Sequence, residues 1–180
     1  MFTLDIHDGL YLKLLEPKDA RFVYTLIQQS KHDLRDWLFW VDETKTIEDS
    51  EAFIEKSMKQ VAANNGFQAG IWYQDQFAGI IGLHNINWIN HNTSLGYWLG
   101  EAFQGKGIMT KACQAMIDML FKEYELNRIE IRVATKNFKS QAIPEKLGFT
   151  KEGCLRQYER LHHGYVDHFV YGLLREEYPS

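Results

Sequence analysis

The chain has 180 residues, of which 45% are hydrophobic and 14% aromatic, and its formal net charge is −4. This composition can bury a sizeable core, which excludes an intrinsically disordered chain, and the acidic balance argues against a broad nucleic-acid-binding surface. Two cysteines are too few for the disulfide framework of a secreted domain, and no apolar run approaches the roughly 20 residues of a membrane span. We therefore expect residues 1–180 to form one domain of a soluble, cytoplasmic enzyme without a membrane or nucleic-acid partner.

The N-terminal third of the chain predicts a strand followed by two helices. Residues 10–15 form the expected strand. The first helix has a buried stripe that consists of Phe22, Val23, Leu26 and Ile27. The second helix begins near Thr46, with Phe53 and Ile54 facing the core. Between the helices, residues 31–40 hold three large aromatic side chains, which either pack over the core or form one wall of a binding cleft.

The rest of the chain alternates predicted strands with helices. The expected strands lie at residues 68–73, 77–84, 93–99 and 128–133, from about residue 147, and at residues 165–174. The first two of these form a hairpin around a short polar turn, and a helix with an apolar stripe follows the third. Hairpins mixed with helical crossovers indicate an α/β fold in which a mixed sheet lies between layers of helices.

The most informative stretch runs from Gly96 to Met109 and reads Gly-Tyr-Trp-Leu-Gly-Glu-Ala-Phe-Gln-Gly-Lys-Gly-Ile-Met. It predicts the end of a strand, a glycine-bearing turn and the first residues of a helix. Backbone N–H groups in such a turn, together with the positive end of the helix dipole, form a pocket for a phosphate group. Gly105 and Gly107 can adopt backbone angles closed to other residues and let a ligand approach closely.

This stretch resembles the acyl-CoA pyrophosphate loop of the GCN5-related N-acetyltransferases (GNAT). Two later blocks extend the resemblance: residues 137–140 followed by Leu147-Gly148-Phe149, and residues 152–159 leading to residues 167–171. Together the blocks are similar to the RimL-type branch, which acetylates a ribosomal protein at its N-terminal serine. The resemblance implies the GNAT fold, which is a three-layer α/β fold with a mostly antiparallel seven-stranded sheet and about four helices. It also implies acetyl-CoA as co-substrate, no metal, and a homodimer.

The resemblance further implies which residues contact acetyl-CoA. Backbone N–H groups of the glycine turn would hold the pyrophosphate, and the end of the preceding strand would pair with the pantetheine arm. The expected contact residues are Trp98, Leu99, Gly100, Gln104, Gly105, Lys106, Gly107, Ile108, Met109, Asn137 and Ser140. Two positions depart from the family pattern. Met109 replaces a small residue, and Pro144 stands where many N-terminal acetyltransferases have a tyrosine that serves as general acid.

Ser140 is the candidate donor of a hydrogen bond or proton to the leaving thiolate, whose ordinary pKa is about 8.5. Serine is also a favoured helix N-cap, and a helix starting near residue 140 would place Pro144 in the first turn, where proline is tolerated. Asn137 could cap the same helix or contact the pantetheine arm. A cap at Asn137 would put Pro144 deep inside the helix at a cost of about 3 kcal/mol, which favours the contact.

Glu159 is the candidate general base, acting through a water, because RimL-type chains carry a glutamate at this position. It could instead hold the ammonium group of the incoming amine, or be a solvated charge at the end of a strand. Glu130 and Arg132 read as a surface ion pair. Asp167-His168 reads as a proton-handling pair or as a structural histidine next to an aspartate. His162-His163 lies in a polar turn that lacks the ligand spacing of a metal site.

Three hypotheses for the function follow. The first is acetylation of a protein N-terminus, whose α-amino group has an ordinary pKa of about 7.7–8.0 and therefore needs only modest help from a base. The second is acetylation of a small amine, such as a polyamine or an aminoglycoside, which the acidic net charge would suit. The third is a non-catalytic acyl-CoA binder, against which Ser140 and Glu159 argue, because a binder needs only the glycine turn.

Overall fold

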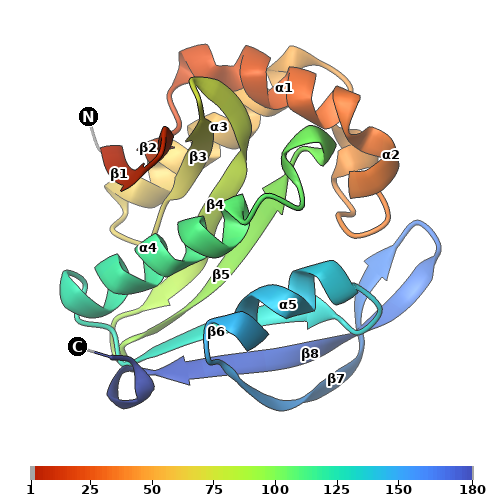
Figure 1. The fold of residues 1–180 in the computed structure, drawn as a ribbon. Coiled ribbons are helices and arrows are strands. Elements are labelled where there is room, and N and C mark those ends of the chain that lie inside the picture. Colours follow the sequence, from red (N-terminus) through yellow and green to blue (C-terminus); the bar gives the residue numbers. More distant parts are fainter. Residues whose placement is uncertain (1–2, 180) are drawn as a thin grey trace.

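The computed structural model describes residues 3–179 and contains a curved eight-stranded sheet with helices on both faces (Figure 1). The strand order is β1-β2-β3-β4-β5-β6-β8-β7. Neighbouring strands are antiparallel except for β5 and β6, which run parallel. The strands are β1 (Thr3–His7), β2 (Leu10–Leu14), β3 (Gln68–Tyr73), β4 (Gln76–Asn87), β5 (Asn92–Leu99), β6 (Arg128–Ala134), β7 (Thr150–Leu161) and β8 (Gly164–Leu174).

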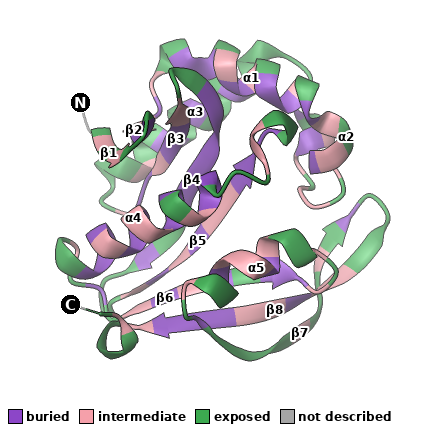
Figure 2. Cartoon of the chain, in the orientation of Figure 1, coloured by how far each residue is buried: buried purple, intermediate pink, exposed green. Residues whose placement is uncertain are grey.

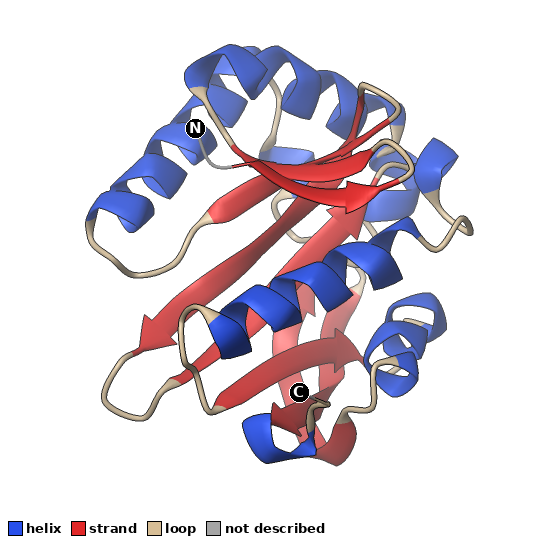
Figure 3. Ribbon diagram, turned by 60° about the vertical axis from the view of Figure 1, so that its left-hand side comes forward, coloured by secondary structure: helices blue, strands red, loops and turns tan. Residues whose placement is uncertain are grey.

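The helices form two layers, one on each face of the sheet (Figures 1 and 3). They are α1 (Ala20–Gln29), α2 (Lys31–Leu34), α3 (Ile47–Ala62), α4 (Ile108–Lys122) and α5 (Phe138–Lys146). Successive side chains of the central strands point to opposite faces of the sheet, so neighbouring residues belong to different hydrophobic cores. Ile80 and Trp98 belong to the cluster that packs under α1 and α3, whereas Ile81 and Leu95 belong to the cluster that packs under α4.

The parallel pair in the middle of the sheet separates along its length. β5 pairs with β6 from Asn92 opposite Arg128 to Leu95 opposite Ile131, and the pairing then stops. On its other side, β5 remains paired with β4 as far as Leu99 opposite Gly79. The edge of β5 from Gly96 to Leu99 therefore has no strand partner toward β6, and an unpaired strand edge can pair with another chain or with a ligand.

Several predictions of the sequence need correction. The sheet has eight strands and not seven, because Thr3–His7 pairs with β2 through a turn at Asp8-Gly9, a dipeptide typical of tight hairpins. The structure has five α-helices where about four were expected, because Lys31–Leu34 forms a short α2. Phe53 does not face the core, since 38% of it is exposed, whereas Ile54 is fully buried as predicted.

The centre of the sheet and its β7 edge differ in burial (Figure 2). The middle of β4 is buried over seven consecutive residues, Phe77–Leu83, because helices cover both of its faces. Most residues of β7, in contrast, are exposed. Within residues 3–179, no helix combines the length and apolar character that crossing a bilayer requires.

Candidate active site

The glycine turn forms an open cradle between β5 and α4. Gly105 and Gly107 have φ angles of +73° and +74°, in the left-handed region that favours glycine. Gly107 is the N-cap of α4, so the N–H groups that follow it lack acceptors within the helix. A Cβ added at either glycine would meet no atom within 4 Å, so the space beside the turn is free of protein. The turn therefore offers backbone donors and room for an anionic group.

The departure at Met109 does not narrow this cradle. The side chains of Ile108 and Met109 are 2% and 5% exposed and belong to the core under α4. They therefore point away from the surface of the turn, and only their backbone is available to a ligand. A larger apolar residue at position 109 adds to the packing of α4 and leaves the cradle open.

Contacts with α1, α2 and the residue between them hold the cradle in place. The Nε2 atom of Gln104 donates to Asp33 Oδ2 at 2.8 Å and to Leu99 O at 3.3 Å. Glu101 N donates to Ser30 Oγ at 3.0 Å. A Cβ on Gly100 would lie 2.4 Å from Leu26 Cδ1, so glycine is needed here for close packing against α1. Gln104 thus holds the loop with its side chain and offers a ligand only its backbone.

The first turn of α5 faces the other side of the gap and carries the two polar residues predicted at positions 137 and 140. Asn137 is the N-cap of α5, and its side chain accepts a hydrogen bond from Ser140 N at 3.2 Å. Ser140 is thus the third residue of the helix and not its cap, and Pro144 lies inside the helix. The argument that proline keeps Asn137 from being the cap is therefore wrong.

Trp98 and Leu99 contribute to the gap through their backbone. Their side chains are 8% and 9% exposed and pack into the two different cores. Trp98 also lies beside Trp40, with ring centroids 6.0 Å apart. The aromatic segment before α3 therefore packs partly over the core, although Phe39 within it remains 57% exposed.

Glu159 and His168 form a pair that sequence analysis did not predict. The Nε2 atom of His168 lies 2.8 Å from Glu159 Oε2, and His168 is buried. A bulge in β7 brings them together: Leu155 pairs with His168 and Glu159 with Val166, so three residues of β7 face only Asp167. Glu159 is therefore a partnered carboxylate and not a solvated charge.

Asp167 stabilises this bulge. Its Oδ1 atom accepts a hydrogen bond from Gln157 N at 2.7 Å, and Gln157 has a φ of +49°. Asp167 and His168 thus act on different partners: the aspartate fixes the backbone of β7, and the histidine contacts Glu159. The reading of Asp167-His168 as a single proton-handling pair is not what the geometry shows.

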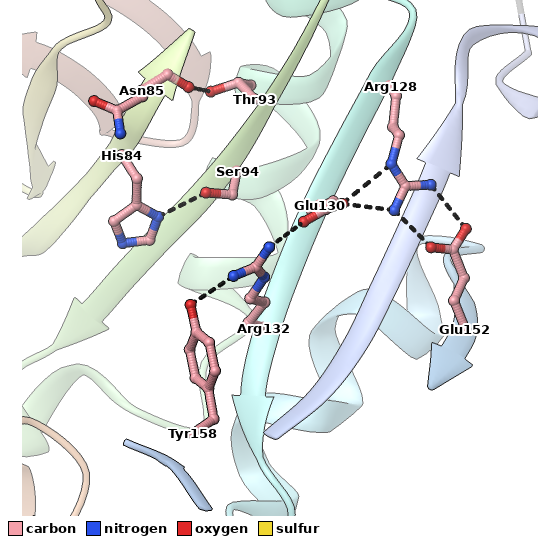
Figure 4. A network of polar contacts seen from close by, with 9 residues as sticks. All are labelled: His84, Asn85, Thr93, Ser94, Arg128, Glu130, Arg132, Glu152 and Tyr158. Carbon is pink, nitrogen blue, oxygen red and sulfur yellow. Dashed lines mark hydrogen bonds and ion pairs between the residues drawn. The ribbon is translucent and has the colours of Figure 1, made fainter. Parts of the chain in front are cut away.

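Polar side chains of β4, β5, β6 and β7 form a further set of contacts on one face of the sheet (Figure 4). Glu130 lies between two guanidinium groups, 2.8 Å from Arg128 Nη2 and 3.1 Å from Arg132 Nη2, so the predicted pair with Arg132 is present. Arg132 also donates to Tyr158 OH at 2.5 Å. Arg128 makes a two-pronged contact with Glu152, whose carboxyl pKa it lowers.

His84 completes this polar face at the point where β5 leaves β6. Its Nδ1 atom lies 2.9 Å from Ser94 Oγ, and its ring occupies the space above Gly96, where a Cβ would be 2.9 Å from the imidazole. Partial burial and the nearby Arg132 guanidinium lower the pKa of His84. No local sequence pattern singles out this histidine, because its partners lie on neighbouring strands.

The tip of the β7–β8 hairpin contacts the segment around α2. His162 Nδ1 lies 3.0 Å from Arg35 O, and His163 Nε2 lies 3.2 Å from Asp36 O. Each imidazole donates to a backbone carbonyl, so the two histidines join segments that are 127 residues apart. Within residues 3–179, no cluster of three or more His, Cys, Asp or Glu side chains has the arrangement of a metal site.

Comparisons with known proteins agree with this geometry. The family model described as the acetyltransferase (GNAT) domain matches residues 10–150. The ribosomal-protein-serine acetyltransferase of Escherichia coli (strain K12) is 29% identical over 169 residues, which cover 94% of each chain. A solved structure of a probable acetyltransferase is 38% identical, covers 98% of this chain and 99% of its own, and has a TM-score of 0.91.

A solved structure of RimL, described as a ribosomal L7/L12 α-N-protein acetyltransferase in complex with coenzyme A, has a TM-score of 0.94. It is 25% identical and covers 98% of this chain and 99% of its own. The family model and these full-length similarities identify the fold and the class of enzyme. The chain belongs to the GNAT acetyltransferase family and is related to the ribosomal-protein N-acetyltransferases.

Proposed function

We propose that this enzyme transfers an acetyl group from acetyl-CoA to the N-terminal α-amine of a protein, namely a serine-starting ribosomal protein. The observation that carries the proposal is the gap between β5 and β6. It has an open phosphate cradle at one end, and Ser140 and the Glu159–His168 pair belong to elements on its β6 side. The relatedness to ribosomal-protein-serine acetyltransferases supports the choice of acceptor.

The residues of the gap fit acetyl-CoA, which when bound supplies an acetyl thioester. The backbone N–H groups of residues 104–109 would hold the pyrophosphate, because the helix start and the space beside the two glycines favour an anion. The free edge at residues 98–100 would pair with the amides of the pantetheine arm. Asn137 uses its Oδ1 atom as the cap of α5, so its amide nitrogen remains available for the same arm. Lys106 is exposed beside the cradle and would add positive charge.

Glu159 would accept the proton that the amine loses, through a water. The hydrogen bond from His168 fixes one carboxylate oxygen and leaves the other free to face the acceptor. This arrangement suits an α-amine, which is a fair fraction neutral at cellular pH and needs only a modest base. A lysine side chain, with an ordinary pKa of about 10.4, would need more help.

Ser140 would donate a hydrogen bond to the departing thiolate. Its hydroxyl is half-buried in the first turn of α5, on the β6 side of the gap. A thiolate with an ordinary pKa of about 8.5 is a good leaving group and needs only one such donor. Ser140 thereby takes the place of the tyrosine that is absent at Pro144.

We also propose that the enzyme works in the cytoplasm as a homodimer. Exposed aromatic side chains, among them Phe39 at 57% and Trp88 at 38%, offer apolar surface for a second subunit. Sedimentation equilibrium at micromolar concentration tests the assembly, and a monomer there would contradict it.

The decisive experiment follows CoA release from acetyl-CoA by thiol colorimetry with a small acceptor panel. The panel holds a peptide with a free N-terminal serine, the same peptide with a blocked N-terminus, spermidine and one aminoglycoside. Turnover with the free peptide alone supports the proposal. Turnover with the small amines would move the function to small-molecule acetylation. Binding of acetyl-CoA without any turnover would favour a folded protein acceptor or a non-catalytic binder.

A further inference from the structure

A backbone carbonyl in the first turn of α5 lacks its usual hydrogen-bond donor. Pro144 lies within α5, four residues after Ser140, and has no N–H to donate to Ser140 O. The proline ring also crowds that carbonyl. In an ordinary helix the carbonyl would then be left without a partner, at the turn that carries the candidate proton donor.

Tyr97 supplies the missing donor from another element. Its hydroxyl donates to Ser140 O at 3.2 Å, across the gap from β5 to α5. Ser140 Oγ lies 3.5 Å from the same Tyr97 oxygen, so one phenol contacts both the backbone and the side chain of Ser140. Burial raises the pKa of the Tyr97 hydroxyl, which therefore stays protonated and able to donate at any working pH.

We infer that Tyr97 is a positioning residue, which replaces the helix donor lost at Pro144 and thereby holds the Ser140 hydroxyl at the acetyl-CoA gap. The inference rests on the proposed role of Ser140. Tyr97 is well placed for this task because it lies on the part of β5 that has left β6 but is still held by β4, opposite Ile81. The phenol thus fixes the first turn of α5 relative to the sheet.

The arrangement explains how a proline is tolerated in the middle of α5. Two further contacts hold the start of the helix: Gln141 Nε2 donates to Ala134 O at 3.1 Å and to Thr135 O at 2.8 Å. These bonds tie α5 to the end of β6 but do not reach the Ser140 carbonyl. Among the side-chain hydrogen bonds of the described residues, the one from Tyr97 is therefore the one that reaches it.

The test is a double-mutant cycle with the acceptor that the panel identifies. Tyr97→Phe keeps the ring and removes the hydroxyl, and we expect kcat to fall about tenfold with little change in KM for acetyl-CoA, since small misplacements can cost up to about a hundredfold. Pro144→Ala restores a backbone N–H that can reach Ser140 O, so alone it leaves activity close to that of the wild type. In the double variant we expect Pro144→Ala to recover most of the lost kcat and the lost thermal stability.

Tyr171→Phe is the matched control. Tyr171 is also buried, and its hydroxyl also reaches α5, but it contacts the Glu145 side chain at 3.0 Å and no helix carbonyl. Pro144→Ala should not rescue any defect of this variant. Rescue of both tyrosine variants would point to general stabilisation of α5 and overturn the inference.

Ser140→Ala separates this inference from the proposed function. If Tyr97 acts through Ser140, adding Tyr97→Phe to Ser140→Ala should lower kcat no further. A full additional loss of kcat would overturn the positioning role even in an active enzyme. If the wild type acetylates neither an amine in the panel nor a folded protein acceptor, the proposed function fails. Thermal unfolding of the Tyr97 and Pro144 variants then decides by itself whether the phenol replaces the missing donor, and absence of rescue there overturns the inference.

Discussion

The two sides of the gap between β5 and β6 present different kinds of chemical groups. On the β5 side, the glycine turn and the start of α4 present backbone groups, and the side chains of Ile108 and Met109 are buried in the core behind them. On the β6 side, the groups that we propose for the chemistry are side chains, namely Ser140 on α5 and the Glu159–His168 pair between β7 and β8. The first side suits recognition of a constant ligand, and the second suits chemistry that depends on single functional groups.

This difference predicts which substitutions should damage each side of the gap. Backbone donors remain when a side chain changes, so only a change of backbone conformation or a steric block should damage the cradle. On the other side, replacing a single functional atom of a side chain should remove that side chain's contribution to turnover. Variants on the two sides should therefore separate acetyl-CoA binding from turnover, and the expected effects differ in size.

The largest effect is expected at Glu159. Glu159→Gln keeps the shape of the side chain but removes its basicity, so kcat should fall by about a hundredfold or more. Steady-state kinetics with the serine peptide from pH 6 to 9 measure this. A fall in kcat with an unchanged acceptor KM identifies a base, whereas a rise in acceptor KM identifies an anchor for the ammonium group.

Glu152→Gln is the control for this variant, because Glu152 also lies on β7 but forms a partly exposed ion pair with Arg128. Losing such a pair typically costs at most about 1 kcal/mol of stability and should leave kcat unchanged. Full turnover by Glu159→Gln across the whole pH range would refute the catalytic role.

The next effect is expected in the cradle. Gly107→Ala adds a methyl group on the open side of the turn at a φ of +74°, so acetyl-CoA affinity should fall about tenfold while kcat at saturation changes little. Gly148→Ala is the matched control, since Gly148 has a φ of +81° and equally open space but lies after α5. Both variants should lose about 1 kcal/mol of stability through left-handed strain. Calorimetric titration with acetyl-CoA that shows equal affinities for the two would contradict a cradle at Gly107.

A smaller effect is expected at Asn137, and it resolves an alternative that the sequence left open. Asn137→Ala removes the cap of α5 and should lower the free energy of unfolding by about 1 kcal/mol, as denaturant titration can measure. Asn137→Asp keeps the capping oxygen and should keep that stability. If Asn137→Asp nevertheless raises KM for acetyl-CoA, the amide nitrogen contacts the cofactor. If neither KM nor stability changes in the alanine variant, both roles are refuted.

The smallest effect is expected from the pH dependence of His84. Its pKa in the folded protein is lowered, so the unfolded chain binds the proton more tightly. The neutral imidazole is therefore compatible with full stability above the unfolded pKa of about 6.5, and stability is lost as the pH falls below it. We expect the melting temperature of the wild type to drop more than that of His84→Gln between pH 7.5 and pH 5.5. Parallel decreases in the two proteins would contradict the lowered pKa.

Much of the architecture was predictable from local patterns. The strands at residues 68–73 and 93–99 and the helix after Gly107 lie within one or two residues of their predicted bounds, because apolar periodicity and turn residues specify them locally. The first strand was missed although Thr3–His7 alternates between polar and apolar residues and Asp8-Gly9 is a hairpin signal. Phe53 was misassigned because α3 buries only a narrow stripe, which includes Ile54.

The two sides of the gap also differ in how far the sequence predicts them. The glycine cradle was predictable from residues 104–109 alone, since positive φ angles and a helix start are local properties of that stretch. The side-chain contacts on the other side depend on how distant segments pack together. The cap at Asn137 tolerates Pro144 because Tyr97 reaches the carbonyl from a different element, and Glu159 meets His168 because a bulge shifts the register of β7. Contacts between segments far apart in the chain depend on strand pairing and packing, which no short stretch of residues encodes.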